Sequence, residues 1–290
     1  MNKKRYGVLG GDLRSAKLAE LIRAQGDDVS IYGFEKSNFD ISFKESENID
    51  ELIKKTDVII GPLPCSYDNK TLNAPYHQKK IYIEEIFKKI KKEQLFIAGK
   101  LGEEILKIAR ENNVNCIDLL KREEMAVLNS IPTAEGAIQI AMEEMVETVH
   151  GSKAVVLGFG RIGKILAKML NGIGADVYVE ARKHSDIAWI RSYGYTPVPL
   201  NQLSLYLENA DVIFNTIPYV ILNMDMLKKV KKNCIIIDLA SKPGGVDFEK
   251  AKEYGIKTVW ALSLPGKVAP LTAAGFLKDT VNNIVNELEG

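Results

Sequence analysis

The sequence predicts an α/β protein made of two lobes, each a parallel β-sheet with helices on both faces, and a cleft between the lobes. Three observations lead to this fold class. Short apolar runs alternate with helical patterns from one end of the chain to the other. The length of 290 residues is enough for two domains, each with its own core. The run from Asp57 to Pro64 and the run from Asp211 to Pro218 also share one pattern, an acid followed by an apolar strand and a loop ending in proline.

The first lobe is expected to span residues 1–128. Five apolar runs in it have the length of buried parallel strands, and the stretches between them repeat apolar residues at helical spacing. The expected strands are Tyr6–Leu9, Val29–Tyr32, Val58–Ile60, Leu95–Ala98 and Asn115–Asp118, and the expected helices include Ala16–Gln25, Ile49–Lys55 and Glu103–Asn112.

The second lobe is expected to span residues 129–271, with residues 272–290 returning to the first lobe as a C-terminal helix. Two long helical patterns are expected to bridge the lobes. One begins near Thr133, with Thr133 as its N-cap after Pro132, and continues to Val149; the other runs from Ala269 to Leu288. The expected strands are Ala154–Leu157, Val177–Val179, Val212–Asn215, Ile235–Asp238 and Thr258–Trp260.

A glycine-rich run follows the first strand of the second lobe and opens a helical pattern. It reads Gly158-Phe159-Gly160-Arg161-Ile162-Gly163, which is the G-x-G-x-x-G spacing of Rossmann dinucleotide sites. The first glycine permits a tight turn, the second lets the backbone approach a pyrophosphate, and the third lets the helix pack closely on the strand. Both lobes are therefore expected to be Rossmann-like. The dinucleotide is assigned to the second, because Gly10-Gly11-Asp12 in the first lobe carries only part of the pattern.

The residues after the next strand indicate which dinucleotide is bound. An NAD site places an acid there for the ribose 2′-hydroxyl, but the spacing puts Ala181 at this position and Glu180 one residue earlier. Because side chains alternate along a strand, Glu180 is expected to point away from the ribose. The basic and hydroxyl side chains that follow suit a 2′-phosphate. We therefore predict NADP, with NAD as the alternative, and assign this contact to Ala181, Arg182, Lys183 and Ser185.

Composition excludes several other classes of protein. The formal net charge is +1, and the lysine-rich run at 88–92 is typical of a solvated helix face, so no nucleic-acid partner is expected. No apolar stretch approaches the roughly 20 residues that cross a bilayer, so no membrane partner is expected. The three cysteines and three histidines form no cluster with metal-ligand spacing. We expect a cytoplasmic protein without a metal site.

Two loops are suited to a carboxylate substrate. One lies in the first lobe, where an arginine and a helix start follow the glycine pair. The other is the helix start expected near Thr133, which would offer free N–H groups and hydroxyls. The residues assigned to substrate binding are Asp12, Arg14, Ser130, Pro132, Thr133, Glu135 and Gly136.

Further cofactor contacts are expected in loops that follow the later strands of the second lobe. No histidine follows His184, which argues against a 2-hydroxy acid substrate, because that chemistry needs an acid–base group near the hydroxyl carbon. The catalytic residue stays unknown, with Glu135 and Lys267 as candidates. The additional cofactor residues are Asn215, Thr216, Ile217, Pro218, Leu239, Ala240, Ser241, Pro265 and Gly266.

These loops together resemble the family of dipicolinate synthase A-subunits of spore-forming bacteria. The resemblance covers nearly the whole chain in order. Leu271 stands where the family often has lysine, which argues against a catalytic lysine at that position. The motifs that carry it are Gly10-Gly11-Asp12 with Arg14, Asn129-Ser130-Ile131-Pro132-Thr133 with Glu135-Gly136, Gly158 to Gly163, Asn215-Thr216-Ile217-Pro218, Asp238-Leu239-Ala240-Ser241, and Leu264-Pro265-Gly266.

The resemblance implies an NADP-dependent oxidoreductase that oxidises a dihydrodipicolinate-level intermediate of lysine biosynthesis to dipicolinate during sporulation, in the cytoplasm of the mother cell. It also implies a flavoprotein-like partner, the dipicolinate synthase B-subunit, together with an oligomeric assembly and a small dicarboxylate substrate. Two alternatives stay open. One is another two-lobed NADP dehydrogenase, of the shikimate or methylenetetrahydrofolate type. The other is a non-catalytic nucleotide-binding subunit whose partner does the chemistry.

Overall fold

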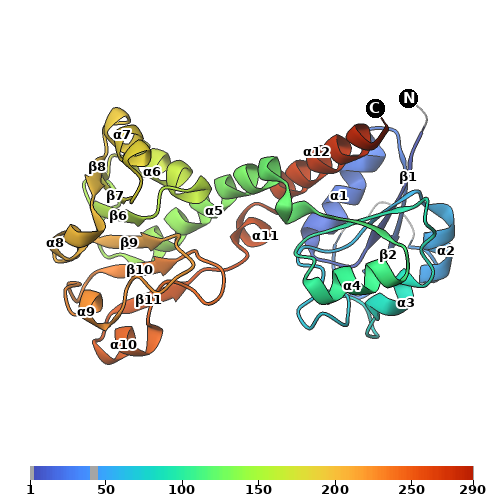
Figure 1. Ribbon diagram of the computed structural model, residues 1–290, viewed down its shortest axis with the longest axis horizontal. Coiled ribbons are helices and arrows are strands. Elements are labelled where there is room, and N and C mark those ends of the chain that lie inside the picture. The colour runs from blue at the N-terminus through green and yellow to red at the C-terminus, as the bar shows by residue number, and fades with distance from the viewer. Residues whose placement is uncertain (1–2, 40–44, 290) are drawn as a thin grey trace. The chain divides into compact units, whose positions relative to one another are not determined.

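The computed structural model describes residues 3–39 and 45–289 (Figure 1). The chain divides into two compact units. Unit 1 consists of residues 1–128 and 269–290, and unit 2 consists of residues 129–268. Residues 269–271, which were expected in the second lobe, fall in unit 1. Both units are parallel α/β sheets, as expected, while the cleft between them stays a prediction.

Unit 1 contains a five-stranded parallel sheet in the order β2-β1-β3-β4-β5. One face packs against α1 (Leu13–Ala24) and α12 (Pro270–Glu289), which lie side by side in Figure 1. The other face packs against α2 (Ile49–Lys55), α3 (Ile83–Phe87) and α4 (Glu103–Glu111). The strands are β1 (Arg5–Leu9), β2 (Asp28–Tyr32), β3 (Val58–Ile60), β4 (Leu95–Ala98) and β5 (Asn115–Asp118), followed by the 3₁₀ turn η1 (Leu119–Lys121).

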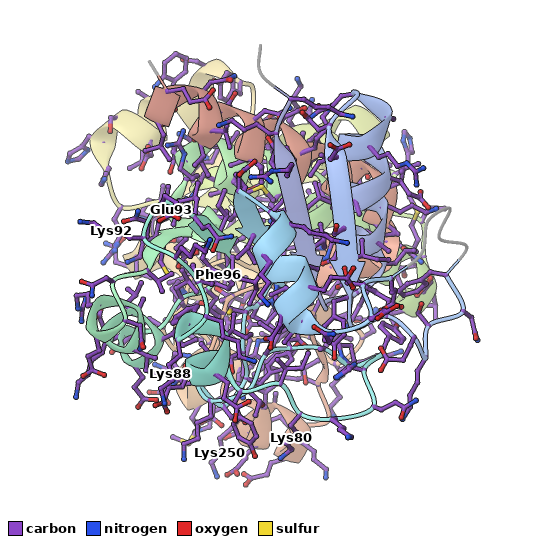
Figure 2. All side chains as sticks on the ribbon, turned by 90° about the vertical axis from the view of Figure 1, so that its right-hand side faces the viewer. Lys80, Lys88, Lys92, Glu93, Phe96 and Lys250 are labelled. Carbon is purple, nitrogen blue, oxygen red and sulfur yellow. The ribbon has the colours of Figure 1, made fainter. Side chains whose placement is uncertain are left out.

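The lysine-rich run at 88–92 lies on the surface of unit 1. Figure 2 shows Lys88 and Lys92 extending outward, whereas Phe96 of β4 lies inside the core and is not exposed. Lys88 forms an ion pair with Glu84 at 2.6 Å, one helical turn away. The four lysines are exposed, but α3 ends at Phe87 and Ile90 is buried, so the run follows a helix and is not the helix face that the charge pattern predicted.

Unit 2 contains a six-stranded parallel sheet in the order β11-β10-β9-β6-β7-β8. This is the strand order of dinucleotide-binding sheets, in which the ligand site lies at the carboxyl ends of the strands where the order reverses, here between β6 and β9. One strand, β8, was not expected. The strands are β6 (Lys153–Leu157), β7 (Asp176–Glu180), β8 (Thr196–Val198), β9 (Val212–Asn215), β10 (Ile235–Asp238) and β11 (Lys257–Trp260).

Helices cover both faces of the sheet in unit 2. One core lies between the sheet and α5, α6 and α7, and a second lies between the sheet and α8, α9 and α10. The helices are α5 (Glu123–Glu144), α6 (Arg161–Ile173), α7 (His184–Ser192), α8 (Leu203–Leu207) after the 3₁₀ turn η2 (Leu200–Gln202), α9 (Met224–Leu227), α10 (Phe248–Glu253) and α11 (Leu264–Val268). Among the described residues, no helix is long and apolar enough to cross a membrane.

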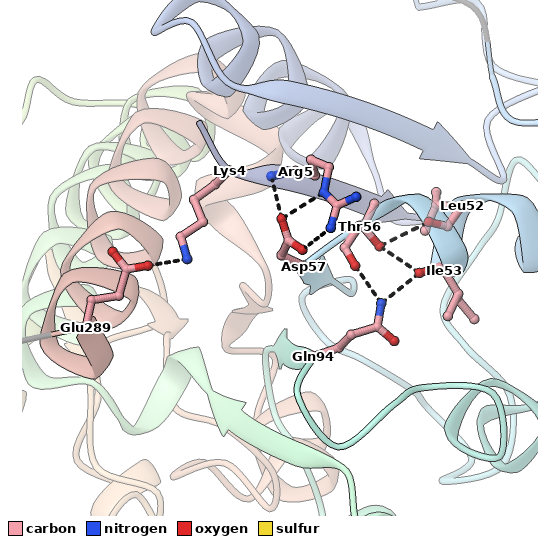
Figure 3. A network of polar contacts seen from close by, with 8 residues as sticks. All are labelled: Lys4, Arg5, Leu52, Ile53, Thr56, Asp57, Gln94 and Glu289. Atoms are coloured by element: carbon pink, nitrogen blue, oxygen red, sulfur yellow. Dashed lines mark hydrogen bonds and ion pairs between the residues drawn. The ribbon is translucent and has the colours of Figure 1, made fainter. Parts of the chain in front are cut away.

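The repeated acid that precedes a strand in each half has the same structural role twice. In unit 1, Asp57 precedes β3 and accepts from the side chain of Arg5, with Nε at 3.0 Å and Nη2 at 2.5 Å (Figure 3). In unit 2, Asp211 precedes β9 and accepts from the backbone N–H of Lys153 at 2.6 Å. Each acid thus fixes the start of a middle strand to the start of the first strand of its own sheet.

Candidate dinucleotide site

The turn between β6 and α6 requires glycine at two positions. Gly158 has φ +93°, and a Cβ there would lie 2.6 Å from Oγ1 of Thr216. A Cβ on Gly163 would lie 2.1 Å from the carbonyl oxygen of Gly158. The first glycine therefore permits the left-handed turn, and the third permits α6 to begin directly against it.

Gly160 differs from these two glycines because it faces open space. Nothing lies within 4 Å of the position that its Cβ would take, and the residue is the N-cap of α6 without a side-chain cap. The first N–H groups of a helix have no partner within the helix, and the helix dipole favours an anion there. The residues at this turn therefore fit the pyrophosphate of a dinucleotide, which would occupy the space beside Gly160.

Two loops at the switch point are held together by a buried polar network. Asp238, at the end of β10, accepts from Nδ2 of Asn215 at 2.8 Å, from the N–H of Ala240 at 3.0 Å and from the N–H of Gly245 at 2.7 Å. Nδ2 of Asn215 also donates to the carbonyl oxygen of Ile217 at 3.0 Å. The network fixes the loop after β9 to the loop after β10.

The two glycines of the second loop allow this close approach. A Cβ on Gly244 would lie 2.9 Å from Oδ2 of Asp238, and one on Gly245 would lie 2.1 Å from Nδ2 of Asn215. Asn215 and Asp238 are both fully buried, so Asn215 acts within the protein rather than as a ligand contact. Of the cofactor residues assigned to these loops, Leu239 and Ala240 are also buried, Thr216 and Ile217 are half-buried, and Pro218 and Ser241 are exposed.

The end of β7 carries the residues assigned to the 2′-phosphate. Arg182, Lys183 and Ser185 are exposed at the start of α7, where a phosphate could reach them. Ala181 is buried in the core beneath α6. Glu180 is buried as well. It ends β7, where Tyr178 packs against one core of unit 2 and Val179 against the other, and its direction relative to a ribose stays a prediction.

The helix start expected near Thr133 does not exist. Helix α5 begins at Glu123 and runs through Pro132, so residues 130–136 lie in its interior. Thr133 is not an N-cap; its hydroxyl donates to the carbonyl oxygen of Asn129 at 2.7 Å, within the helix. The predicted helix start and N-cap were therefore wrong. Because interior N–H groups of a helix are already bonded, the substrate assignment of Ser130, Pro132, Thr133 and Gly136 loses the free N–H groups on which it rested, and it stays a prediction.

Gly136 has a packing role instead. A Cβ at this position would lie 3.1 Å from Cγ1 of Val268 and 3.2 Å from Cβ of Leu264. The glycine thus lets α11 approach α5. Within α11, Pro265 is buried, Gly266 is half-buried, and the candidate base Lys267 is exposed.

Glu135, the other candidate base, lies beside the C-terminal turns of α6, whereas the glycine turn is at its N-terminus. It is exposed and lines a surface groove of about 530 Å³ with Met142, Met169 and Ile173. Met169 and Ile173 belong to the last turns of α6, about 12 Å or more along the helix from the turn at Gly160. Within unit 2, Glu135 is therefore far from the expected cofactor turn.

In unit 1, the partial glycine pattern is filled by the protein itself. The N–H of Gly11 donates to the carbonyl oxygen of Asn73 at 2.9 Å, and a Cβ on Gly10 would lie 2.8 Å from Cβ of Ala74. The loop that contains Asn73 and Ala74 thus occupies the place where a pyrophosphate would approach these glycines.

The first turn of α1 is also engaged. Asp12 caps the helix by accepting from the N–H of Arg14 at 3.0 Å. Arg14 is buried; its Nη2 donates to Asp12 at 2.8 Å and to the carbonyl oxygen of Leu63 at 2.6 Å. The arginine holds the loop after β3, and its remaining nitrogen, Nη1, has no hydrogen bond among the described residues. Within the described ranges, no cluster of three or more His, Cys, Asp or Glu side chains could hold a metal.

Comparison with known proteins identifies the family. A family model described as the N-terminal domain of the dipicolinate synthase A-subunit matches residues 5–120. The A-subunit of dipicolinate synthase from Bacillus subtilis (strain 168) is 31% identical over 287 residues, which cover 98% of this chain and 97% of that protein. The chain belongs to the family of dipicolinate synthase A-subunits.

Solved structures of dipicolinate synthase A-subunits agree with this assignment. The crystal structure from Bacillus halodurans has a TM-score of 0.89 and 31% identity, and covers 97% of each chain. That of the dipicolinate synthase A chain from Bacillus subtilis has a TM-score of 0.90 and 31% identity, and covers 100% of this chain and 98% of that one. A second family model, the NAD-binding domain of D-isomer specific 2-hydroxyacid dehydrogenases, matches residues 127–246. The fold of these A-subunits thus carries a dehydrogenase-type domain for a nicotinamide cofactor, in a family named as one subunit of a larger enzyme.

Two residues beside this turn have roles that the sequence analysis does not assign. Asp238 is the centre of the buried network, and its signal in the sequence is an acid that ends an apolar strand shortly before two glycines. Glu180 is buried, which the strand pattern alone does not predict.

Proposed function

We propose that this chain is the NADP-dependent subunit of a dipicolinate synthase, which oxidises a dihydrodipicolinate-level intermediate of lysine biosynthesis to dipicolinate. The observation that carries the proposal is the open space at Gly160 on the N-cap of α6. It lies in a chain whose relative of nearly equal length is named as the A-subunit of dipicolinate synthase. The comparisons support the family and the nicotinamide cofactor, while substrate and reaction are part of the proposal.

In the proposed reaction, the substrate ring would lose a hydride and a proton and become an aromatic pyridine; the bound dinucleotide would supply the acceptor for the hydride. Unit 2 would hold the dinucleotide at the turn from Gly158 to Gly163, with the 2′-phosphate beside Arg182 and Lys183. The Asn215–Asp238 network would hold the two neighbouring loops in place. Lys267 remains the candidate for the proton, because it is exposed on α11 and Glu135 is remote from the turn.

For the substrate, unit 1 would supply Arg14. Asp12 and the carbonyl oxygen of Leu63 fix its Nε and Nη2, which leaves Nη1 for one carboxylate of the dicarboxylate. A guanidinium held by other groups loses little side-chain entropy when it binds. We propose further that the chain works with a flavoprotein-like B-subunit, as an oligomer, in the mother-cell cytoplasm of a sporulating bacterium.

The test is formation of dipicolinate by the purified chain with the dihydrodipicolinate-level substrate and NADP or NAD, with and without the flavoprotein-like partner. Dipicolinate and NADPH should appear in equal amounts, and faster with NADP than with NAD. Product formation by the partner alone would assign the chemistry to that protein. No product from either protein or from the mixture would contradict the proposed reaction.

A further inference from the structure

Glu180, the last residue of β7, carries a carboxyl group out of contact with solvent. The residue is 2% exposed, and among the described residues no hydrogen-bond partner reaches its Oε1. Its carbonyl oxygen accepts the N–H of Gly158 at 3.2 Å, so the residue lies beside the first glycine of the dinucleotide turn. A buried charged group without a partner is strongly destabilising. This carboxyl group therefore needs an explanation that packing does not provide.

The charged residue that acts on Glu180 is Arg182, two residues further along the chain. Burial raises the pKa of the Glu180 carboxyl, and the charge of Arg182 and the N–H of Gly158 oppose this effect. The carboxyl thus keeps its proton to a higher pH than an exposed glutamate does. Among the described residues, the strand partners of Glu180 are the apolar Leu157 and Val198, and Tyr178, two residues earlier on β7, packs against Tyr206.

We propose that Glu180 is a specificity-determining residue of the dinucleotide site, and that its carboxyl must be neutral for the site to hold a 2′-phosphate beside Arg182. This rests on the proposed function, because it takes the dinucleotide to bind at the turn after β6. When ionised, Glu180 attracts the guanidinium of Arg182 and repels a 2′-phosphate, and solvent screens buried charges only weakly. NAD has no 2′-phosphate, so its binding changes less. The preference for NADP over NAD therefore decreases as Glu180 loses its proton.

The experiment is calorimetric titration of NADP and NAD into wild type, Glu180→Gln and Glu249→Gln between pH 5.5 and 9. Glutamine keeps the size of the side chain without its charge, and Glu249 is a carboxylate of α10 in the same unit, remote in sequence from the turn. At high pH, the dissociation constant of NADP divided by that of NAD should be about tenfold larger in wild type than in Glu180→Gln. The 2′-phosphate of free NADP also titrates, with a second pKa of about 6, but this titration of the free ligand is common to all three measurements. Glu249→Gln should follow wild type.

If the ratio of the two dissociation constants depends on pH in the same way in wild type and in Glu180→Gln, the proposal is overturned. A change in Glu249→Gln as large as that in Glu180→Gln would also overturn it. Arg182→Ala provides a second measurement that leaves Glu180 unchanged. In this variant, the ratio of the NADP and NAD dissociation constants should lose the part of its pH dependence that Glu180→Gln also removes. A pH dependence as large as that of wild type would contradict the coupling between Glu180 and Arg182. A folded wild-type protein that binds neither dinucleotide would refute the proposed function itself, whereas binding with an unchanged ratio refutes only the role of Glu180.

Discussion

Asn215 donates a hydrogen bond to Asp238 across 2.8 Å, and neither residue is exposed. The two residues end neighbouring strands, β9 and β10, at the carboxyl edge of the sheet. Asp238 accepts two further bonds from backbone N–H groups, and this requires a carboxylate rather than an amide.

Asp238→Asn should therefore destabilise unit 2. The NH₂ group of the introduced amide would face N–H donors instead of accepting from them. Leaving a buried donor without a partner lowers the free energy of unfolding by about 1–3 kcal/mol. We expect the thermal midpoint to fall. Asp176→Asn, at an exposed acid that begins β7, is the control and should leave the midpoint unchanged. Equal midpoints for both variants would contradict the role assigned to the network.

The glycines of the dinucleotide turn predict two different phenotypes. Gly160→Val should fold normally and lose dinucleotide binding, because its side chain would enter the open space beside α6. Gly163→Val should be destabilised, because its Cβ would meet the carbonyl oxygen of Gly158. Thermal denaturation and fluorescence titration with NADP separate the two effects. If Gly160→Val binds NADP with wild-type affinity, the cofactor lies elsewhere.

Cofactor choice is tested at the start of α7. Arg182→Ala should weaken NADP binding by at least about tenfold and NAD binding much less, because a charge-assisted hydrogen bond contributes about 1.5–3 kcal/mol. Arg191→Ala, at the exposed other end of the same helix, is the matched control. Calorimetric titration that finds equal losses for NADP and NAD in Arg182→Ala would remove the argument for a 2′-phosphate site.

The buried carboxyl of Glu180 predicts how stability depends on pH. Burial raises the pKa of this group in the folded protein above its value in the unfolded chain. The contribution of the protonated carboxyl to the free energy of unfolding is fully present below the pKa that Glu180 has in the unfolded chain. It is lost as pH rises through the pKa of the folded protein, because over this range the unfolded chain ionises more readily than the folded one. Glu180→Gln should remove this loss, which is on the order of 1–3 kcal/mol. Urea unfolding from pH 5 to 9 should show the variant gaining stability over wild type as pH rises; a constant difference would contradict this.

Substrate binding is tested at Arg14. Arg14→Ala should lower kcat/KM by roughly ten- to a hundredfold, because a contact of about 1.5–3 kcal/mol to a carboxylate is lost, while affinity for NADP should barely change. Arg23→Ala, at the exposed end of the same helix, controls for charge and helix stability. Steady-state kinetics in the presence of the flavoprotein-like partner decide. Wild-type turnover by a folded Arg14→Ala protein would exclude this placement of the substrate.

Buried parallel strands were predictable because both faces of each strand are apolar, which leaves a short, dense apolar run such as Val58–Ile60 or Ile235–Asp238. The missed strand, β8, has only three residues and contains Pro197, and it lies at the edge of the sheet where a ladder N–H is not required. Such a strand lacks the apolar run from which the other strands were predicted.

The helix error has a clear physical origin. Proline is common in the first turn of a helix, so Pro132 followed by Thr133 indicated a start. In the structure, Pro132 is the tenth residue of α5, and tertiary packing of Ala134, Ala137 and Ala141 in the core outweighs the lost hydrogen bond. For the site, local spacing was enough to place the glycine turn, but the partners of Asp238 and Arg14 come from other loops and could not be deduced.

Helix α12 has a consequence for how the protein is made. Its residues Ala274, Leu277, Val281 and Ile284 complete the core on one face of the sheet in unit 1, and its end is tied down by pairs from Lys4 and Arg122 to Glu289 and Glu287. Unit 2 is encoded between the two segments of unit 1. On the ribosome, the nascent chain can therefore fold its second domain while the first still exposes the apolar face that α12 covers later. A chain whose synthesis stops before α12 would have one folded domain and one exposed apolar surface, and chaperones and proteases act on such chains.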